Sequence, residues 1–296
     1  MAASSAPVGV NDLFQRLFTR PTFLDDASYA SIFPLELLVT LGGGMALAHF
    51  VLVTWVLPAL LPRLLPFYTK LDKLQKGNLE NDLACCTHHL VVVPASMYCL
   101  YLQAMTPLGQ EPDYSLMVPV VCLTMGYFVA DFIMLLPRFV KLQSMDFFIH
   151  HIVGIALVDI GLRNSFGARW VPWFLLTEIT TIVFTGCKLL MKAGKKESTA
   201  YKVLAALFTL LFLLVRVLLL PVASYWLSWG HAKDAQRMGV RVVLPPILCA
   251  MQVYWFGLIL VKVFPMAFGG ASATKAVDPG VPEDGKNMSP EVKKGQ

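Results

Sequence analysis

Charged side chains are scarce in this sequence, whereas apolar ones are abundant. Only 15% of the 296 residues are Asp, Glu, Lys or Arg, and 56% are hydrophobic. Soluble domains carry about 25% charged residues, so too few polar side chains are present to cover a soluble globule. The same balance excludes a disordered chain, which needs low hydrophobicity and high net charge.

Three other features are missing. The first 34 residues have no apolar core after a basic start, so we expect no cleavable signal peptide. No basic patch with interleaved aromatic residues lies outside the apolar segments, so the net charge of +5 does not indicate nucleic-acid binding. No cysteine lies in a predicted lumenal loop, and all six fall inside apolar segments, which predicts packing residues rather than disulfides.

Long apolar segments dominate what remains. A helix needs roughly 20 apolar residues to cross a bilayer, and nine of the 43 charged residues lie in the candidate segments. We therefore predict an all-α polytopic membrane protein with about seven transmembrane helices. Their predicted bounds are 35–62, 83–105, 116–137, 145–162, 170–191, 201–229 and 242–264. The segment 145–162 is the shortest and among the most polar of them.

Lys and Arg in the connecting loops predict the orientation. With the N-terminus in the lumen, 16 of them fall on the cytosolic side and seven on the other. The C-terminus is then cytosolic, and it ends Lys293-Lys294-Gly295-Gln296. This dilysine resembles the address that retrieval coats recognise on membrane proteins of the endoplasmic reticulum.

The chain ends lie outside the apolar segments. Residues 1–34 form a predicted lumenal segment, in which Val10, Leu13, Phe14, Leu17 and Phe18 mark one face of an interfacial helix. A weak transit sequence is the alternative, because the first eleven residues contain no acid. Residues 266–296 are rich in Gly, Pro, Ser and Lys. This composition predicts a disordered cytosolic tail.

Ionisable residues inside membrane segments are costly and mark functional candidates. Counted at about 1.5 Å per residue from the predicted cytosolic ends, one group shares a shallow layer. It consists of His88, His89, Asp131, His150 and His151. A deeper layer consists of Asp159, Glu178, Arg216 and His49, and we expect Arg216 to pair with Glu178 or Asp159.

The two histidines of segment 145–162 point in different directions. His150 and His151 are about 100° apart around a helix, so one can face a cavity while the other contacts a neighbouring helix. Asp146 lies four residues before His150, on the same face, and is placed to orient its ring. Because adjacent histidines diverge, each helix offers one good ligand, and we predict no metal site among these histidines and Asp131.

At this point the residues show a family resemblance. Residues 145–154, with the His150-His151 pair, resemble the central motif of the TLC-domain family, which includes ceramide synthases. Residues 126–131 resemble the motif on the preceding helix, and residues 177–181 the acidic motif of the smaller members. The resemblance covers roughly residues 75–265. It implies that six helices form a bundle around a lipid-accessible cavity, usually in the endoplasmic reticulum, with residues 35–62 as a separate first helix.

The resemblance implies two functions. The first is ceramide-synthase-like acyl transfer from acyl-CoA to a sphingoid base, without a further cofactor. His150 or His151 is then the base or nucleophile, and Asp146 or Asp131 is the orienting acid. The cavity lining would include His88, His89, Asp159, Glu178 and Arg216.

The alternative is a non-catalytic protein that binds or regulates membrane lipids or acts in trafficking. The His-Asp pair and further Asp of true synthases are replaced here by Thr177, Glu178 and Thr181. The homeobox-like insertion of many synthases is absent too. The chain therefore resembles the smaller members more closely.

Overall fold

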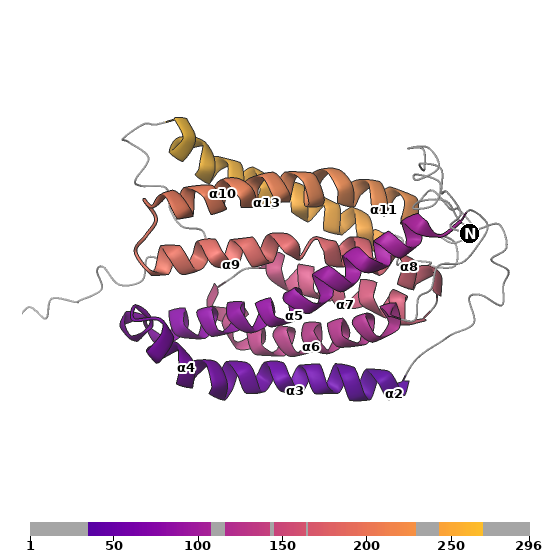
Figure 1. The fold of residues 1–296 in the computed structure, drawn as a ribbon, viewed down its shortest axis with the longest axis horizontal. Coiled ribbons are helices and arrows are strands. Elements are labelled where there is room, and N and C mark those ends of the chain that lie inside the picture. Colours follow the sequence, from indigo (N-terminus) through magenta and orange to yellow (C-terminus); the bar gives the residue numbers. More distant parts are fainter. Residues whose placement is uncertain (1–34, 108–115, 143–144, 164, 229–242, 269–296) are drawn as a thin grey trace, which may run out of the picture.

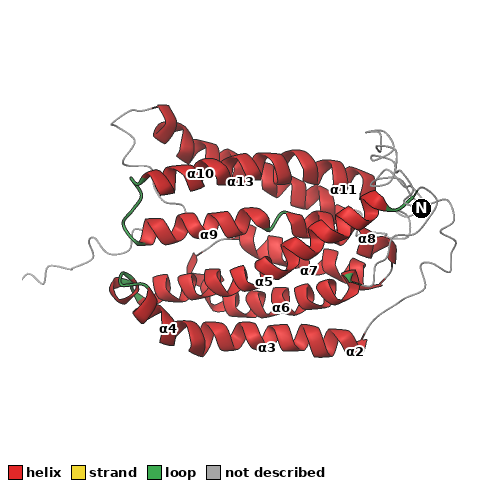
Figure 2. Ribbon diagram, viewed as in Figure 1, coloured by secondary structure: helices red, strands yellow, loops and turns green. Residues whose placement is uncertain are grey.

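The computed structural model describes residues 35–107, 116–142, 145–163, 165–228 and 243–268. Across these ranges the chain forms helices joined by short turns, without a strand (Figure 2). The predicted all-α class is confirmed.

A long helical stretch opens the described chain and is followed by the helices of the main bundle. The elements of the first stretch are α2 (Leu35–Leu37), η2 (Leu38–Gly42), α3 (Gly43–Val51), η3 (Leu52–Val56) and α4 (Leu57–Leu64). The elements that follow are η4 (Tyr68–Lys70), α5 (Lys73–Met105), α6 (Met117–Leu142), α7 (Met145–Arg163), α8 (Ser165–Leu176), α9 (Ile179–Lys192), α10 (Thr199–Leu211), η5 (Phe212–Leu219), α11 (Leu220–Ser228) and α13 (Leu244–Phe268).

Within the described residues, six helical stretches are long and apolar enough to cross a membrane. Their bounds are Leu35–Leu64, Lys73–Met105, Met117–Leu136, Trp170–Lys192, Thr199–Tyr225 and Leu244–Val261. They correspond to six of the seven predicted segments and confirm a polytopic protein. The remaining segment is the shorter helix α7, which is not among these six.

Two predicted helices differ from the observed ones. Helix α5 begins at Lys73, ten residues before the predicted start, because Asp72 and Gln75 form a capping box there. The predicted helix 170–191 is interrupted between α8 and α9. At the break, the amides of Thr177 and Glu178 donate to carbonyls three residues back, as in a turn.

The helices form a bundle whose centre contains α5, α6, α7 and α8. Helix α3 packs along α6, while α9 contacts α5 and α10, and α13 contacts α7 and α11. In Figure 1, α3 accordingly forms the lower edge, and α10 and α13 form the upper edge. The α4–α5 and α9–α10 connections lie at the same end of the bundle (Figure 1).

Two glycines let the first stretch approach α6 closely. A Cβ atom built on Gly126 would lie 1.9 Å from the carbonyl oxygen of Gly42, and one on Gly42 would lie 2.9 Å from the carbonyl oxygen of Cys122. No side chain fits such a contact, so backbone packs on backbone. Small residues play this part between membrane helices, where apolar burial supplies little driving force.

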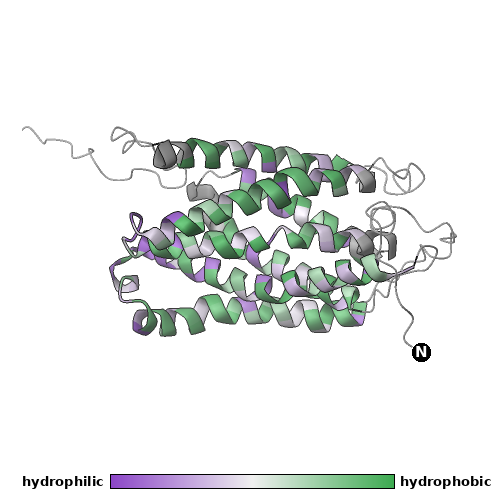
Figure 3. Cartoon of the chain, turned by 45° about the horizontal axis from the view of Figure 1, so that its top comes forward, coloured by the Kyte–Doolittle hydropathy of each residue, from purple (hydrophilic) through white to green (hydrophobic). Residues whose placement is uncertain are grey.

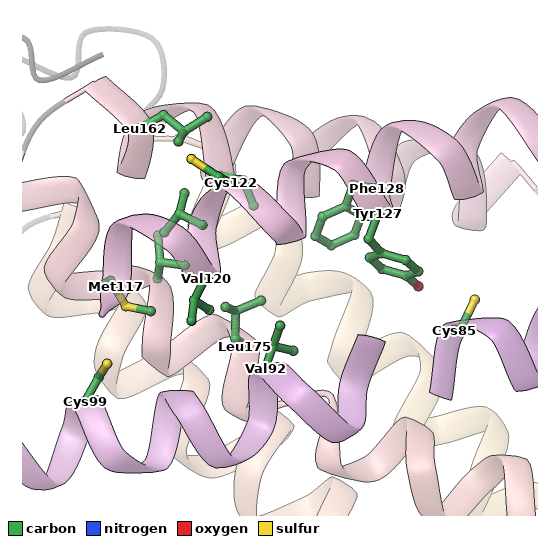
Figure 4. Close-up of a cluster of buried hydrophobic side chains, with 13 residues drawn as sticks. Cys85, Val92, Cys99, Met117, Val120, Cys122, Tyr127, Phe128, Leu162 and Leu175 are labelled. Atoms are coloured by element: carbon green, nitrogen blue, oxygen red, sulfur yellow. The ribbon is translucent and has the colours of Figure 1, made fainter. Parts of the chain in front are cut away.

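A buried apolar cluster joins the four central helices. It contains Val92 on α5, Tyr127 and Phe128 on α6, Leu162 on α7 and Leu175 on α8 (Figure 4). Outward-facing apolar side chains such as Val39, Leu90 and Val203 remain exposed, as a lipid-facing surface requires. Figure 3 shows hydrophilic residues at the connected end and at isolated interior positions.

The turn between α4 and α5 is tied to the bundle by a buried tyrosine. The Tyr68 hydroxyl donates a short hydrogen bond to the Glu80 carboxylate. Burial, together with the Glu80 charge, raises the pKa of Tyr68 to about 12. The tyrosine is therefore a protonated donor at neutral pH.

Several predictions lie outside the described residues. They are the interfacial helix within 1–34, most of the 266–296 tail and the dilysine Lys293-Lys294. Helix α13 continues to Phe268, three residues into the predicted tail. All six cysteines lie in described residues, and none of them forms a disulfide.

Candidate functional site

A buried carboxylate on α6 anchors the first polar cluster. The two oxygens of Asp131 lie 2.6 Å from His151 Nε2 on α7 and 2.6 Å from Asn81 Nδ2 on α5. The other ring nitrogen of His151 is 2.8 Å from the Phe147 carbonyl oxygen, one helical turn back. The imidazole is thereby held at both nitrogens, and it joins α7 to α6.

His49 of α3 reaches the same carboxylate. Its Nε2 atom lies 3.4 Å from Asn81 Oδ1 and 4.0 Å from Asp131 Oδ1. The Cys85 thiol of α5 lies 3.5 Å from that oxygen. Helices α3 and α5 therefore place polar atoms around Asp131 Oδ1, while α7 contacts the other oxygen.

Arg216 anchors the second cluster. Its guanidinium lies 3.7 Å from the Glu178 carboxylate, which is one of the two partners predicted for it. It also donates to the Thr180 hydroxyl at 2.7 Å and to Gln252 Oε1 at 3.0 Å. A guanidinium inside a bundle is tolerated when its charge is paired and its donors are used.

Local backbone irregularities position this cluster. Glu178 lies at the break between α8 and α9, and its oxygen accepts a hydrogen bond from Thr181 at 2.8 Å. Arg216 lies within η5, an eight-residue π-helical segment. Segments of this kind often occur at functional sites.

The two clusters are contiguous through α5 and α6. His89 Nε2 lies 3.3 Å from Glu178 Oε2, at ion-pair distance but without hydrogen-bond alignment. The neighbouring His88 stacks on Tyr127 at 4.0 Å between ring centroids, and His49 meets the edge of the same ring. Tyr127 thus lies between His49, which contacts Asp131, and His88, whose neighbour His89 contacts Glu178.

The predicted separation into two depth layers is therefore wrong in its membership. His89 of the shallow layer contacts Glu178, and His49 of the deep layer contacts Asp131. The predicted depths on this helix are measured from residue 83, its predicted start, but α5 begins at Lys73. His88 therefore lies about 22 Å along its helix, close to the depth expected for Glu178.

His150 faces away from these contacts and lines a cavity. The cavity is bounded by α6, α7, α8, η5 and α13, and its polar lining residues are His150, Thr177, Glu178, Arg216 and Gln252. The remaining lining is apolar, with Phe128, Leu157, Phe174 and Leu248 among it. His150 and His151 point in different directions, as expected for adjacent residues of a helix. His150 lines the cavity and His151 packs against α6.

The cavity has polar atoms to offer a ligand. Nδ1 of His150 and Nε2 of Gln252 are buried and have no hydrogen-bond partner among the described residues. The volume is about 40 Å³, which is space for about three water molecules. A lipid head group therefore needs some separation of the helices to enter.

The two remaining acids of α7 have other positions. Asp146 accepts a hydrogen bond from Trp255 Nε1 of α13 at 2.7 Å, and the Trp255 ring packs on His150 at 5.3 Å. Asp146 therefore supports His150 through an indole rather than as a direct orienting acid. Asp159, which was the other partner predicted for Arg216, is half-buried farther along α7. The observed ion pair of Arg216 is with Glu178.

Sequence reasoning missed five residues of the site, namely Asn81, Cys85, Thr180, Tyr127 and Gln252. Asn81 lies in the polar first turns of α5, which were assigned to a loop. The capping signal at Asp72 could have placed it on a helix. Gln252 is an uncharged amide in an apolar segment and lies next to no motif, so only its buried position identifies it.

The Asp131 cluster and the cavity differ in the hydrogen-bonding groups that they could offer to a ligand. Around Asp131, imidazole, amide and thiol groups contact one another and connect α3, α5, α6 and α7, and His49 Nδ1 has no hydrogen-bond partner among the described residues. Around the cavity, an imidazole and an amide retain free hydrogen-bonding capacity beside a paired Glu178–Arg216. The cavity can therefore bind a small polar group with its apolar part among the helices.

Comparison with known proteins agrees with this architecture. Residues 78–261 match the TLC domain. TLC domain-containing protein 2 of Mus musculus is 26% identical over 125 residues, which are 42% of this chain and 40% of the mouse protein. The matched part is therefore less than half of that curated relative. Together with six long apolar helices, the domain indicates a multi-pass membrane protein with a lipid-related role. Since the matched domain occupies most of the sequence, the chain belongs to the TLC-domain family.

Proposed function

We propose that the protein acts on a membrane lipid in the endoplasmic reticulum, and that the cavity beside His150 receives the polar head of that lipid. The observation that carries the proposal is the pair of unpartnered buried atoms, His150 Nδ1 and Gln252 Nε2, in one cavity. Buried polar groups normally have partners, so two in one cavity favour a ligand. The dilysine tail supports the location.

The reaction we propose is acyl transfer from acyl-CoA to a sphingoid amine. The amine nitrogen attacks the thioester carbonyl carbon, so that a C–N bond forms and the C–S bond breaks. His150 Nδ1 accepts the proton from the amine and passes it to the departing CoA sulfur. The Glu178 and Arg216 side chains would hold the head group beside it, and basic residues near 188–202 would meet the CoA phosphates.

A non-catalytic lipid-binding or lipid-regulating role is the second candidate. One observation favours it: the acid predicted to orient His150, Asp146, instead accepts a hydrogen bond from Trp255. A histidine base without a direct carboxylate partner is less strongly oriented. In this role the cavity would bind a lipid head group without changing it.

The test uses purified full-length protein with labelled acyl-CoA and sphinganine, and lipid profiles of a deletion strain complemented with each variant. We expect His150→Ala to abolish N-acylsphinganine formation, since it removes the only imidazole among the described lining residues of the cavity. The matched control is Leu248→Met, which changes an apolar lining residue at similar volume and should retain most of the product.

The outcomes separate the two candidates. Product from wild type and none from His150→Ala, with both proteins equally abundant and monodisperse, supports acyl transfer. If wild type makes no product but His150→Ala still fails to restore the lipid profile, the binding role is supported. Full restoration of the profile by His150→Ala would reject both roles for this cavity.

A further inference from the structure

We propose that His49, Cys85 and Asp131 form a site for a divalent transition-metal ion, most suitably Zn²⁺, inside the helix bundle. The inference is independent of the cavity and of the function proposed for it. It departs from the metal-free prediction, which considered only the paired histidines and Asp131.

The donor atoms already lie close together. His49 Nε2, Cys85 Sγ and Asp131 Oδ1 are all within 4.8 Å of one another. The sulfur is 3.5 Å from the carboxylate oxygen, and the imidazole nitrogen is 4.0 Å from it. Tetrahedral zinc with ordinary bond lengths separates such ligand atoms by about 3.3–3.6 Å. The sulfur and the carboxylate oxygen already have this spacing, whereas the imidazole nitrogen must move about 0.7 Å closer to the oxygen and at most about 1.3 Å closer to the sulfur.

The donor types suit zinc rather than a hard cation. An imidazole, a thiolate and a carboxylate form a mixed set of nitrogen, sulfur and oxygen, which favours zinc and related ions over calcium or magnesium. Three protein ligands leave a fourth position. The Asn81 amide contacts all three groups, with Oδ1 at 3.4 Å from His49 Nε2, and can supply an oxygen there.

Charge balance also supports a divalent ion. A net charge is costly within a membrane protein, whereas one dication with one thiolate and one carboxylate sums to zero. The Cys85 thiol now lies at hydrogen-bond distance from Asp131. Binding of the ion would form the metal–sulfur bond and release that thiol proton to solvent.

The surroundings provide an outer shell. His151 Nε2 lies 2.6 Å from the second oxygen of Asp131, which fixes the carboxylate while its first oxygen remains directed at His49 and Cys85. Such outer contacts orient metal ligands. His49 and Asp131 are almost completely buried, and Cys85 and Tyr127 lie at the same end of the apolar cluster in Figure 4.

The position of the ligands suggests a structural role. His49 lies on α3, outside the matched domain of residues 78–261, whereas Cys85 and Asp131 lie within it. One ion would thus fasten the first helical stretch to the TLC domain by coordinate bonds. The Gly42–Gly126 contact also brings the first helical stretch, which carries His49, against α6, which carries Asp131.

The experiment measures metal content and a spectroscopic signature in full-length protein purified in detergent without a metal-affinity tag. After incubation with Zn²⁺ and removal of excess, we expect about one zinc per chain by elemental analysis. Replacement by Co²⁺ should produce a thiolate-to-cobalt charge-transfer band. Cys85→Ser should lose the band, and His49→Gln should lose most of the metal.

Cys86→Ser is the matched control, because the neighbouring thiol is not in the cluster. It should retain both metal and band. Should Cys85→Ser not accumulate, wild type is tested alone, with a chelator expected to lower its melting temperature and Zn²⁺ to restore it. Less than about one-fifth equivalent of zinc in loaded wild type, or an unchanged cobalt band in Cys85→Ser, would overturn the proposal.

Discussion

At the residue scale, Asp131, which is buried, and Glu178, which is half-buried, are stabilised by different partners. Asp131 contacts the neutral amide of Asn81 and the imidazole of His151. Glu178 depends on the permanent charge of Arg216, with His89 beside it. Loss of one partner from a buried pair leaves an uncompensated charge and typically costs about 3–5 kcal/mol.

We therefore predict that Arg216→Leu strongly destabilises the protein, by about 3–5 kcal/mol, because Glu178 would keep its charge without its cation. Glu178→Gln in the same chain should recover part of the loss. Thermal unfolding in detergent, followed by size-exclusion chromatography, measures both.

Lys188→Met is the control for that prediction. Lys188 pairs with Asp82 at 2.8 Å, but both side chains are more than one-fifth exposed, and pairs of this kind contribute about 0–1 kcal/mol. If Arg216→Leu shifts the melting temperature no more than Lys188→Met does, the buried pair is not the stabilising contact we describe.

At the scale of elements, a backbone contact joins the first helical stretch to α6 at Gly42 and Gly126. This approach brings His49 to the Asn81–Asp131 cluster. The contact involves backbone atoms, which cannot rotate away as a side chain could. The position of His49 therefore depends on these glycines.

Gly126→Ala should lower stability by about 1–3 kcal/mol, the usual cost of overpacking, because its Cβ would overlap the Gly42 carbonyl. Gly43→Ala provides the comparison, since a Cβ there meets nothing within 4 Å. It should be neutral or slightly stabilising, as Ala favours helix. Equal melting temperatures for the two variants would contradict the close contact.

The elements themselves were largely predictable from the sequence, whereas their junctions were not. Apolar run length located every described membrane helix, because hydrophobic length is set by the bilayer. The break at Thr177–Glu178 lies inside a predicted membrane segment, in a polar stretch that indicated a site motif rather than a helix end, and the π-helical segment contains Arg216 within a run of Leu and Val. Both depend on tertiary contacts of Glu178 and Arg216.

The residues of the candidate site were identified in part. Buried ionisable groups stood out against apolar neighbours, so the histidine pairs, Asp131, Glu178 and Arg216 were all found. Their partners were harder to assign, because helix tilt and the true start of α5 determine which groups meet. Asp146 illustrates this, since its contact is with Trp255 on α13, 109 residues away.

At the scale of the whole molecule, the connections at one end carry many of the basic residues. Lys70, Lys73 and Lys76 lie around the α4–α5 turn, and Lys192, Lys195 and Lys196 lie around the α9–α10 turn. Both turns lie at the same end of the bundle (Figure 1). Loops rich in Lys and Arg favour the cytosolic side.

We predict that single cysteines placed at Lys70 and Lys195, in a chain without its native cysteines, react with a membrane-impermeant maleimide from the cytosolic side. Selective permeabilisation of the plasma membrane measures this. A cysteine at Leu116, at the start of α6, should react only after the inner membranes are also opened. The reverse pattern would invert the proposed orientation.

The dilysine gives a second prediction at this scale. Lys293→Ser with Lys294→Ser should shift the protein from the endoplasmic reticulum to later compartments, because the coat that reads the address no longer binds. Fluorescence microscopy of the tagged full-length chain measures the shift, with the tag placed at the N-terminus. Lys286→Ser serves as the control, and retention of the double variant would remove this support for the location.

The π-helical segment Phe212–Leu219 has a consequence for helical phase. Phe212, Arg216 and Leu220 are buried and four residues apart. Side chains four residues apart lie on one face of a helix, so the three form one inward row. Deletion of one residue between Phe212 and Arg216 would rotate Arg216 and Leu220 together by about 100° relative to Phe212. Insertions and deletions here should therefore be tolerated far less than substitutions of the outward-facing Leu214 or Leu218.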